Sequence, residues 1–462
     1  MKSIIYLLVL ITLILLTPYR LETFNAAYNF NISVVYLVTL LYFFYQQSRY
    51  NKNWLRFDVI FLIGYTIVHF QIPFLASIGI EPERPSFIWI NKDVVNFATW
   101  MSAVTIVLWM WGFSLYGYRK RTKQRAFNSQ NSIINYCKYD IILFLSFIVF
   151  LSLVGTSIFQ GVYDGGGSWG NGANHAFLLL RVLLYLRIIY FFRSFKRNTS
   201  LKRIVKKLLI YKLFLITLSI YTLLFLLSGD RGPVLYVSLV AGGAYALYIR
   251  PVPLRKLILI VFLGAFLFTV IRLGRGRDST EFNESNIFER GYANYTESEQ
   301  GVNVTDELAS SVRIQYRALD VIPNKHPYLY GITFFTVGIG TAPFLGSTIM
   351  EVFDIPKQYA GSAMFFTVLG QGPNPSYGEG SEILADIYIN FGLYGTFIIM
   401  FIFGIYTNIV NQRAQNFDFT YVLIFLILLT SAITMNRAML LSPLKDIVYV
   451  LFFNWIFTRV IK

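Results

Sequence analysis

The chain alternates long apolar runs with short polar connections along most of its length. About twelve of these runs are long enough to cross a bilayer core of ~30 Å, and lipid forces such runs to be helical because it offers no partners to backbone polar groups. We place them at 3–18, 31–46, 57–74, 95–117, 140–160, 176–193, 208–227, 233–249, 256–273, 388–409, 419–436 and 444–460. The pattern predicts an all-α polytopic membrane protein.

One long polar interruption divides this series. Nine predicted spans lie in 1–272, a loop covers 273–387, and three further spans lie in 388–462. Inside the loop, apolar positions at helical spacing predict an amphipathic helix from Asp306 to Ile322, which Pro323 ends.

The apolar segment 332–350 is interrupted by Gly338, Gly340, Pro343 and Gly346. This composition favours a re-entrant or interfacial pair of half-helices. The alternative is a thirteenth span, which would reverse the orientation of everything that follows it.

The distribution of charge sets the predicted orientation. The formal net charge is +16, and the basic residues gather in alternate connections between the first nine spans. The clusters lie at 49–56, 119–138, 193–207 and 250–256. The positive-inside rule places these connections and both termini in the cytoplasm. The 273–380 stretch, with seven Lys or Arg against twelve Asp or Glu, then lies outside. The charge therefore indicates topology rather than nucleic-acid binding.

Composition limits the chemistry. The single cysteine, Cys137, excludes an internal disulfide, a cysteine-clustered zinc site and an iron–sulfur centre. The three histidines lie far apart in the sequence, which disfavours a histidine-based metal site. No phosphate-loop, HExxH or GxSxG motif is present. We therefore expect no metal and no nucleotide or other cofactor.

Arginines at the predicted outer surface are candidate ligands for a diphosphate, because a guanidinium pairs well with phosphate oxygens. These candidates are Arg231, Arg272, Arg275, Arg313, Arg317 and Arg437. Arg231 lies in the short turn Ser228-Gly229-Asp230-Arg231-Gly232-Pro233 before a predicted helix, where an Asp230–Arg231 capping pair is the alternative. Four of the other arginines have simpler explanations too: Arg272 and Arg275 as interfacial side chains that reach for water, and Arg313 and Arg317 as partners of acids in the same loop.

Four residues are candidate acids or bases. Glu382 and Asp386 are four positions apart and share a face at the start of a predicted span, an arrangement that raises one carboxyl pKa when the pair is partly buried. A solvated first helical turn is the alternative. Asp230 and His326 are the other two candidates.

These features together resemble the Wzy-type O-antigen (oligosaccharide repeat unit) polymerases of bacterial envelopes. The resemblance rests on the turn 228–233, on the large external loop late in the chain, and on the helix start Glu382-Ile-Leu-Ala-Asp386-Ile-Tyr-Ile-Asn-Phe-Gly-Leu-Tyr-Gly395. It covers about 215–445, and Asp386 stands where many members carry Glu.

The resemblance implies a C-type membrane glycosyltransferase fold in the bacterial inner membrane, with the active site facing the periplasm. It implies undecaprenyl-diphosphate-linked oligosaccharides as substrates in lipopolysaccharide biosynthesis. The growing glycan would leave its carrier and join the non-reducing end of a new lipid-linked repeat unit, without metal or nucleotide. The expected partners are these lipids and the bilayer, with a polysaccharide chain-length regulator as a further candidate and no nucleic acid.

Two other functions stay open on the sequence. An O-antigen ligase would use the same donor chemistry. A flippase or other transporter would suit Arg181 and Arg187, which lie inside the run 176–193. Two features argue against a transporter. The sequence shows no repeat of the whole bundle, and it predicts an extensive polar surface on only one side of the membrane.

Overall fold

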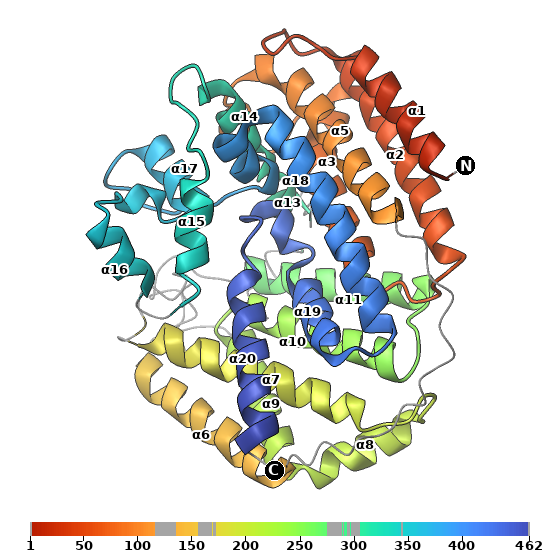
Figure 1. The fold of residues 1–462 in the computed structure, drawn as a ribbon, viewed down its shortest axis with the longest axis vertical. Coiled ribbons are helices and arrows are strands. Elements are labelled where there is room, and N and C mark those ends of the chain that lie inside the picture. Colours follow the sequence, from red (N-terminus) through yellow and green to blue (C-terminus); the bar gives the residue numbers. More distant parts are fainter. Residues whose placement is uncertain are drawn as a thin grey trace. The chain divides into compact units, whose positions relative to one another are not determined.

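The computed structural model describes residues 2–115, 135–155, 172–274, 305–342 and 345–460, together with positions 169, 289, 291, 292 and 296. These residues form helices, turns and connections, with no strand among them (Figure 1). They belong to two compact units, which we treat separately. Unit 1 comprises 1–51, 56–123 and 305–445, and unit 2 comprises 52–55, 124–304 and 446–462. The division into 1–272, 273–387 and 388–462 that the sequence predicts rests on membrane topology, which these units do not test. It stays a prediction.

Unit 1 contains the N-terminal helices and most of the helices that follow residue 305. Its elements are α1 (Lys2–Leu15), α2 (Ala26–Ser48), α3 (Phe57–Ser77), α4 (Pro85–Ile88), η1 (Lys92–Val94), α5 (Val95–Leu115), α13 (Asp306–Ala309), α14 (Val312–Val321), α15 (Ile332–Ile339), α16 (Leu345–Val352), η4 (Lys357–Tyr359), α17 (Ser362–Gln371), α18 (Ile383–Gln415), α19 (Phe419–Ser431) and η5 (Thr434–Arg437).

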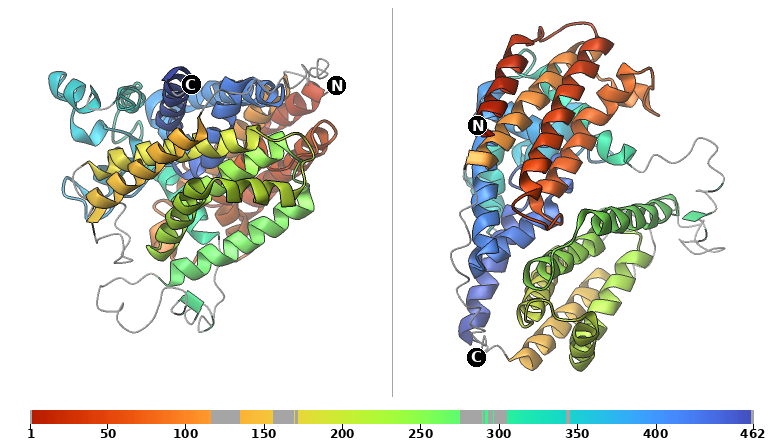
Figure 2. Two further views of the ribbon diagram at one scale, coloured as in Figure 1. Left: turned by 90° about the horizontal axis from the view of Figure 1, so that it is seen from below. Right: turned by 90° about the vertical axis from the view of Figure 1, so that its right-hand side faces the viewer.

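Helix α5 is the centre of unit 1. Nearly all its side chains are buried, and α1, α2, α3, α14 and α18 pack against it. Figure 2 shows α1 and α2 running beside α5. The backbones of α5 and α18 approach closely where Gly112 and Gly404 face them: a Cβ on Gly404 would overlap the carbonyl oxygen of Trp109, and one on Gly112 would overlap that of Phe401. Small residues permit such approaches between membrane helices.

Helix α18 is broken near its start. Gly392 has φ +67° and ψ −169°, which departs from helical geometry and belongs to a region that favours glycine. The break separates the buried first segment, Ile383–Asn390, from the longer segment that packs along α5. The direction of the first segment is therefore set independently of the second.

Two predicted elements inside the loop can be compared with the structure. The amphipathic helix expected over Asp306–Ile322 is split into α13 and α14 at Ser310 and Ser311. The segment 332–350 contains two eight-residue helices, α15 and α16, that contact each other. At a rise of ~1.5 Å per residue, each is about 12 Å long and too short to span a bilayer alone.

Unit 2 is helical as well. It contains α6 (Tyr136–Val154), α7 (Ala173–Arg193), α8 (Leu201–Ile210), α9 (Lys212–Leu227), α10 (Gly232–Tyr248), α11 (Leu254–Leu273) and most of α20 (Leu444–Val460). Helices α6 and α10 both pack against α7 and α9.

Seven helices in the described part of the chain are long and apolar enough to cross a membrane. They lie at Ala26–Ser48, Phe57–Ser77, Lys92–Leu115, Tyr136–Val154, Ala173–Arg193, Leu254–Ile271 and Ile383–Gln415, and the bent pair α8 and α9 would make an eighth. A polytopic helical membrane protein is therefore supported, and each of the twelve predicted runs contains a helix. The count of twelve spans and the C-type fold stay predictions.

Candidate functional site

Two arginines on α14 converge on one carboxylate. Arg313 forms an ion pair with the carboxylate of Glu379, and its Nη2 donates to the backbone carbonyl of Glu379 at 3.1 Å. Arg317 Nη1 lies 3.4 Å from the same Oε2 of Glu379. The spacing of four residues, which predicted a shared face for the two arginines, places both guanidinium groups at one acid. The resulting cluster of Arg313, Arg317 and Glu379 carries a net charge of +1.

The two arginines are held to different degrees. The Arg313 guanidinium also lies 4.1 Å from the centre of the Phe87 ring, and its side chain is 7% exposed. The Arg317 side chain is 16% exposed, and its second contact is a 3.5 Å hydrogen bond to the carbonyl of Phe366 on α17. Arg313 is therefore the anchored member of the pair, and Arg317 is the one with fewer and longer contacts.

Glu379 is positioned by the loop that follows α17. Its backbone N–H donates to Thr367 Oγ1 at 2.9 Å, and the hydroxyl of Tyr377 lies 3.4 Å from its Oε1. Burial raises the pKa of the Glu379 carboxyl, but the hydrogen bond and charge of Arg313 and the charge of Arg317 outweigh burial, so the net pKa is below the ordinary value.

Gly370 leaves the space that Arg317 occupies. A Cβ at Gly370, on α17, would overlap Arg317 Nη1 and lie 3.0 Å from Glu379 Oε1. In the loop that follows α17, a Cβ on Gly378 would meet nothing within 4 Å. Of these two glycines, only Gly370 must lack a side chain for Arg317 to take its position.

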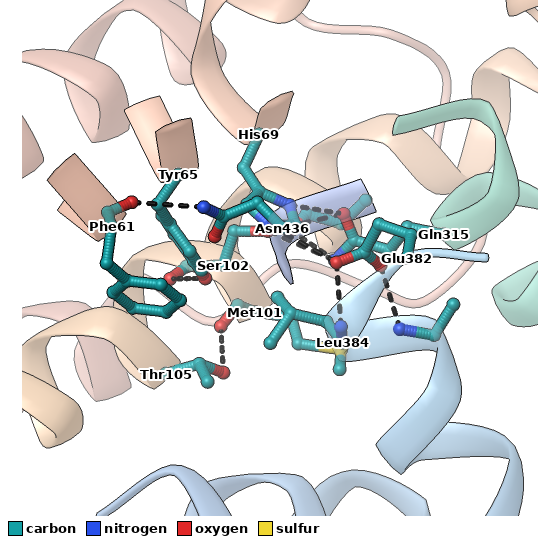
Figure 3. Close-up of polar contacts among 12 residues, drawn as sticks. Phe61, Tyr65, His69, Met101, Ser102, Thr105, Gln315, Glu382, Leu384 and Asn436 are labelled. Atoms are coloured by element: carbon teal, nitrogen blue, oxygen red, sulfur yellow. Dashed lines mark hydrogen bonds and ion pairs between the residues drawn. The ribbon is translucent and has the colours of Figure 1, made fainter. Parts of the chain in front are cut away.

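A second polar cluster lies inside unit 1 and joins side chains of α3, α5 and α14 to the start of α18 (Figure 3). Gln315, between the two arginines in sequence, donates from Nε2 to Ser102 Oγ at 3.0 Å and to the carbonyl of Ala98 at 3.3 Å, both on α5. Its Oε1 lies 3.3 Å from His69 Nδ1 on α3. His69 Nε2 lies 3.2 Å from Glu382 Oε1, an ion-pair distance without hydrogen-bond alignment.

The two predicted acids at the start of α18 are both buried and both contact backbone amides. Glu382 caps α18, accepting from the N–H of Leu384 at 2.7 Å and of Ala385 at 2.8 Å. Asp386 Oδ2 accepts from the N–H of Leu440 at 2.9 Å. Glu382 is 0% exposed and Asp386 is 2% exposed. In a solvated first helical turn, both side chains would be in contact with water. A role for either as a base stays a prediction.

The remaining candidates in unit 1, Arg437 and His326, are partly exposed. Arg437 Nη1 lies 3.1 Å from Glu307 Oε1, and both side chains are about two-fifths exposed. His326 is half-buried, with Nδ1 2.7 Å from the carbonyl oxygen of Pro327 and its ring 5.2 Å from that of Phe365 on α17.

In unit 2, Asp230 acts as a cap. Its Oδ1 accepts from the N–H of Gly232 at 3.2 Å, at the start of α10, and Arg231 is the residue before that helix. The contact supports the capping alternative for Asp230 and does not test binding by Arg231. The side chain of Arg272 and all of Arg275 fall outside the described residues.

Arg181 and Arg187 on α7 have protein partners. Arg187 pairs with Asp140 on α6, and Arg181 pairs with Asp446 on α20. A substrate path is therefore not needed to explain these two charges.

Sequence reasoning did not identify His69, Gln315 or Gly370. A histidine inside the apolar run of α3 was the available signal for His69, because a polar residue in such a run requires a partner. For Gln315 and Gly370 the sequence carries no comparable signal. Within the described ranges, no three His, Cys, Asp or Glu side chains come together as a set of metal ligands.

The long apolar helices and buried ion pairs define a polytopic helical membrane protein with a basic cluster on its loop helix. Residues 1–461 match the family model of the O-antigen polysaccharide polymerase Wzy. The chain therefore belongs to this family, and the resemblance inferred from about 215–445 is confirmed over the whole chain. Membership supports a role in polysaccharide polymerisation. No curated protein and no solved structure matches the chain.

The ion pairs of Glu379 predict an acid-sensitive contribution to stability. Because its folded-state pKa is lowered, the contribution is complete above the ordinary value of 4.5 and is lost as the pH falls below it, through the folded-state pKa. Glu379→Gln should therefore lower the thermal unfolding midpoint of the full chain in detergent at pH 7, and the difference from wild type should shrink towards pH 3.

Asp320→Asn is the control for this titration. Burial raises the pKa of the Asp320 carboxyl, but hydrogen bonds from Lys325 at 2.6 Å and Asn91 at 2.8 Å outweigh it and lower the pKa. Lys325 is 63% exposed, so we expect a smaller pH-dependent difference for Asp320→Asn than for Glu379→Gln. A midpoint difference for Glu379→Gln that stays constant with pH would contradict the assignment of the ion pairs as its source.

Proposed function

We propose that this chain is a glycosyltransferase that polymerises O-antigen at the periplasmic face of the bacterial inner membrane, with both termini in the cytoplasm. It transfers the growing undecaprenyl-diphosphate-linked glycan onto the non-reducing end of a new lipid-linked repeat unit, without metal or nucleotide. Family membership supports the polymerase role. The observation that carries the proposal further is the convergence of Arg313 and Arg317 on Glu379.

In this reaction the bond between the anomeric carbon of the growing glycan and the diphosphate oxygen breaks. A hydroxyl of the acceptor sugar forms the new glycosidic bond and loses its proton to a base. Undecaprenyl diphosphate leaves with the bonding electrons, so negative charge grows on its phosphate oxygens. Guanidinium groups that are already oriented stabilise that charge without further reorganisation.

Arg317 is the better placed of the pair to contact the diphosphate. A phosphate oxygen can take the place of its 3.4 Å contact to Glu379 while Arg313 keeps its own contacts to the Glu379 carboxylate and carbonyl. Glu379 thus occupies an anion position between the guanidinium groups. Arg231, Arg272, Arg275 and Arg437 stay candidates for further contacts to the lipid diphosphate.

Among the four candidate bases, His326 has the most suitable arrangement. A hydrogen bond from Nδ1–H to the carbonyl of Pro327 fixes the tautomer in which Nε2 accepts a proton. Its ring packs on Phe365, and the carbonyl of the next residue, Phe366, accepts from Arg317. Glu382 and Asp386 already bind backbone amides, and Asp230 caps α10.

The lipopolysaccharide profile of a strain lacking this protein tests the overall function. We expect core carrying a single repeat unit, because flipping and ligation continue while polymerisation stops. Wild-type protein should restore the ladder of longer chains on a gel. Bare core in the deletion strain would instead indicate a ligase or a flippase.

Arg317→Ala should lower the rate of polymerisation by about 10²-fold, a typical effect of removing one preorganised charge donor. The measurement is chain elongation in membrane vesicles supplied with lipid-linked repeat units, at matched protein levels. An unchanged rate would remove Arg317 from the diphosphate site.

Gly370→Ala offers a second way to displace the same guanidinium. It should slow elongation, whereas Gly378→Ala, in the loop that follows α17 and with open space around it, should not. In a chain that already carries Arg317→Ala, adding Gly370→Ala should have little further effect, because the effects of two substitutions that act through one group do not add. Additive effects would mean that Gly370 acts independently of Arg317.

His326→Gly should lower elongation by about 10²–10⁴-fold, the usual contribution of a general base. Added imidazole should restore part of the rate, since it can enter the space left by the ring and accept the proton. His175→Gly, at the start of α7 in unit 2, is the control. Loss of activity without imidazole rescue would count against a proton-transfer role.

A further inference from the structure

Helix α8, residues Leu201–Ile210, has two chemically opposite faces. Its sequence, LKRIVKKLLI, places Leu201, Ile204, Val205, Leu208 and Leu209 on one side of a helix with 3.6 residues per turn. The opposite side carries four cations and no acid. They are Lys202, Arg203, Lys206 and Lys207.

The connection to α9 fixes how α8 relates to a membrane. A single residue, Tyr211, separates the helices, and the chain bends there by 100°. Helix α9 is apolar from Leu213 to Leu227, as a membrane-embedded segment is. Four cations within ten residues are too costly for the bilayer core, so α8 leaves α9 nearly at a right angle and lies along the surface.

Burial divides the apolar face of α8 into two edges. Ile204 is 7% exposed and packs on unit 2. The other edge is uncovered: Leu201 is 68%, Val205 48% and Leu209 57% exposed. A row of aliphatic side chains at successive turns is unfavourable in water and matches the boundary between headgroups and acyl chains.

The cations divide in the same way. Lys207 contacts the protein, since its Nζ donates to Ser194 Oγ at 2.8 Å and lies 4.8 Å from the centre of the Phe195 ring. Lys202, Arg203 and Lys206 are exposed and form no ion pair within the described part of the chain. They are available to a ligand outside the protein.

Other basic connections of unit 2 meet the start of α8. The N–H of Asn198 donates to the carbonyl of Ile249 at 3.1 Å, and Arg250 donates to the carbonyl of Asn198 at 3.2 Å. The N–H of Trp54 donates to the carbonyl of Val252 at 2.8 Å. The stretches 52–55, 193–212 and 249–256, which these contacts join, contain no Asp or Glu. These joined stretches of unit 2 are thus rich in cations and contain no acidic residue.

We infer that α8 is an interfacial anchor that binds anionic phospholipid headgroups. The edge formed by Leu201, Val205 and Leu209 inserts at the boundary of the acyl chains, and Lys202, Arg203 and Lys206 contact the headgroup phosphates. An anionic surface is favoured over a zwitterionic one because no acidic residue of the joined stretches offsets these cations. The inference is independent of the proposed enzymatic function.

A dye on α8 in the full chain tests this inference. Cys137→Ser removes the only cysteine. Val205→Cys then carries an environment-sensitive dye on the apolar edge, and Ile210→Cys carries it five residues further, about 140° around the helix. The labelled chains are placed in nanodiscs of phosphatidylcholine alone or mixed with phosphatidylglycerol.

We expect blue-shifted emission at Val205→Cys, quenched by nitroxides on the acyl chains, only with phosphatidylglycerol, and neither effect at Ile210→Cys. Each of Lys202→Gln, Arg203→Gln and Lys206→Gln should weaken the response about fivefold, the equivalent of ~1 kcal/mol per surface charge. The response should also fall between about 0.1 M and 1 M salt, where the Debye length drops from ~10 Å to ~3 Å.

Equal signals in the two lipid mixtures would overturn the inference, and so would equal signals at the two labelled positions. Inorganic phosphate added to nanodiscs of phosphatidylcholine alone should leave the signal unchanged. A response to free phosphate would overturn the assignment to headgroups. The comparison of the two lipid mixtures uses a chain that keeps all the cations of α8. It therefore tests the inference even if a charge variant folds poorly.

Discussion

The polar chain from Ser102 through Gln315 and His69 to Glu382 is the interaction on which the arrangement of unit 1 depends. These groups lie in an apolar interior, where an unpaired polar group costs about 1–3 kcal/mol and where each member is a partner of the next. They come from α5, α14, α3 and the start of α18. Moving any one of these helices would break at least one of these contacts.

This constraint also sets the protonation of the cluster. The amide oxygen of Gln315 only accepts, so the facing nitrogen of His69, Nδ1, carries a proton. His69 Nε2 and Glu382 Oε1 lie 3.2 Å apart without hydrogen-bond alignment. The backbone amides of Leu384 and Ala385 fix the orientation of the Glu382 carboxyl group.

The arginine cluster is built on the same elements. Gln315 fixes α14 against α5, and the residues two positions before and after it, Arg313 and Arg317, lie on the opposite face of the helix. Glu382 fixes the start of α18, only three residues after Glu379. The hydrogen bonds that satisfy the buried groups thus determine the distance between the two guanidinium groups and their carboxylate. Helix α14 belongs to the long loop in sequence but to the core of unit 1 in space.

The part of this site that depends on local periodicity could be predicted from the sequence. Four residues separate Arg313 from Arg317, so a helix places both on one face whatever surrounds it. The helices in the twelve apolar runs follow from composition in the same way. The partners could not be predicted, because 246 positions separate His69 from Gln315 and 66 separate Arg313 from Glu379. The split of the predicted helix at Ser310 and Ser311 was equally invisible, since the apolar spacing continues across it.

Two glycines, Gly392 and Gly404, allow α18 to pack tightly against α5 and also to begin in the polar cluster. At Gly404 the helix contacts α5 so closely that no side chain fits, which holds the long segment rigidly against the centre of unit 1. A continuous helix would then carry Glu382 and Asp386 in a direction fixed by that packing. The positive φ at Gly392 removes this coupling, so Ile383–Asn390 takes its direction from His69 and from the N–H of Leu440. The break in α18 therefore allows a tightly packed membrane helix to begin in a polar cluster whose geometry is set by other elements.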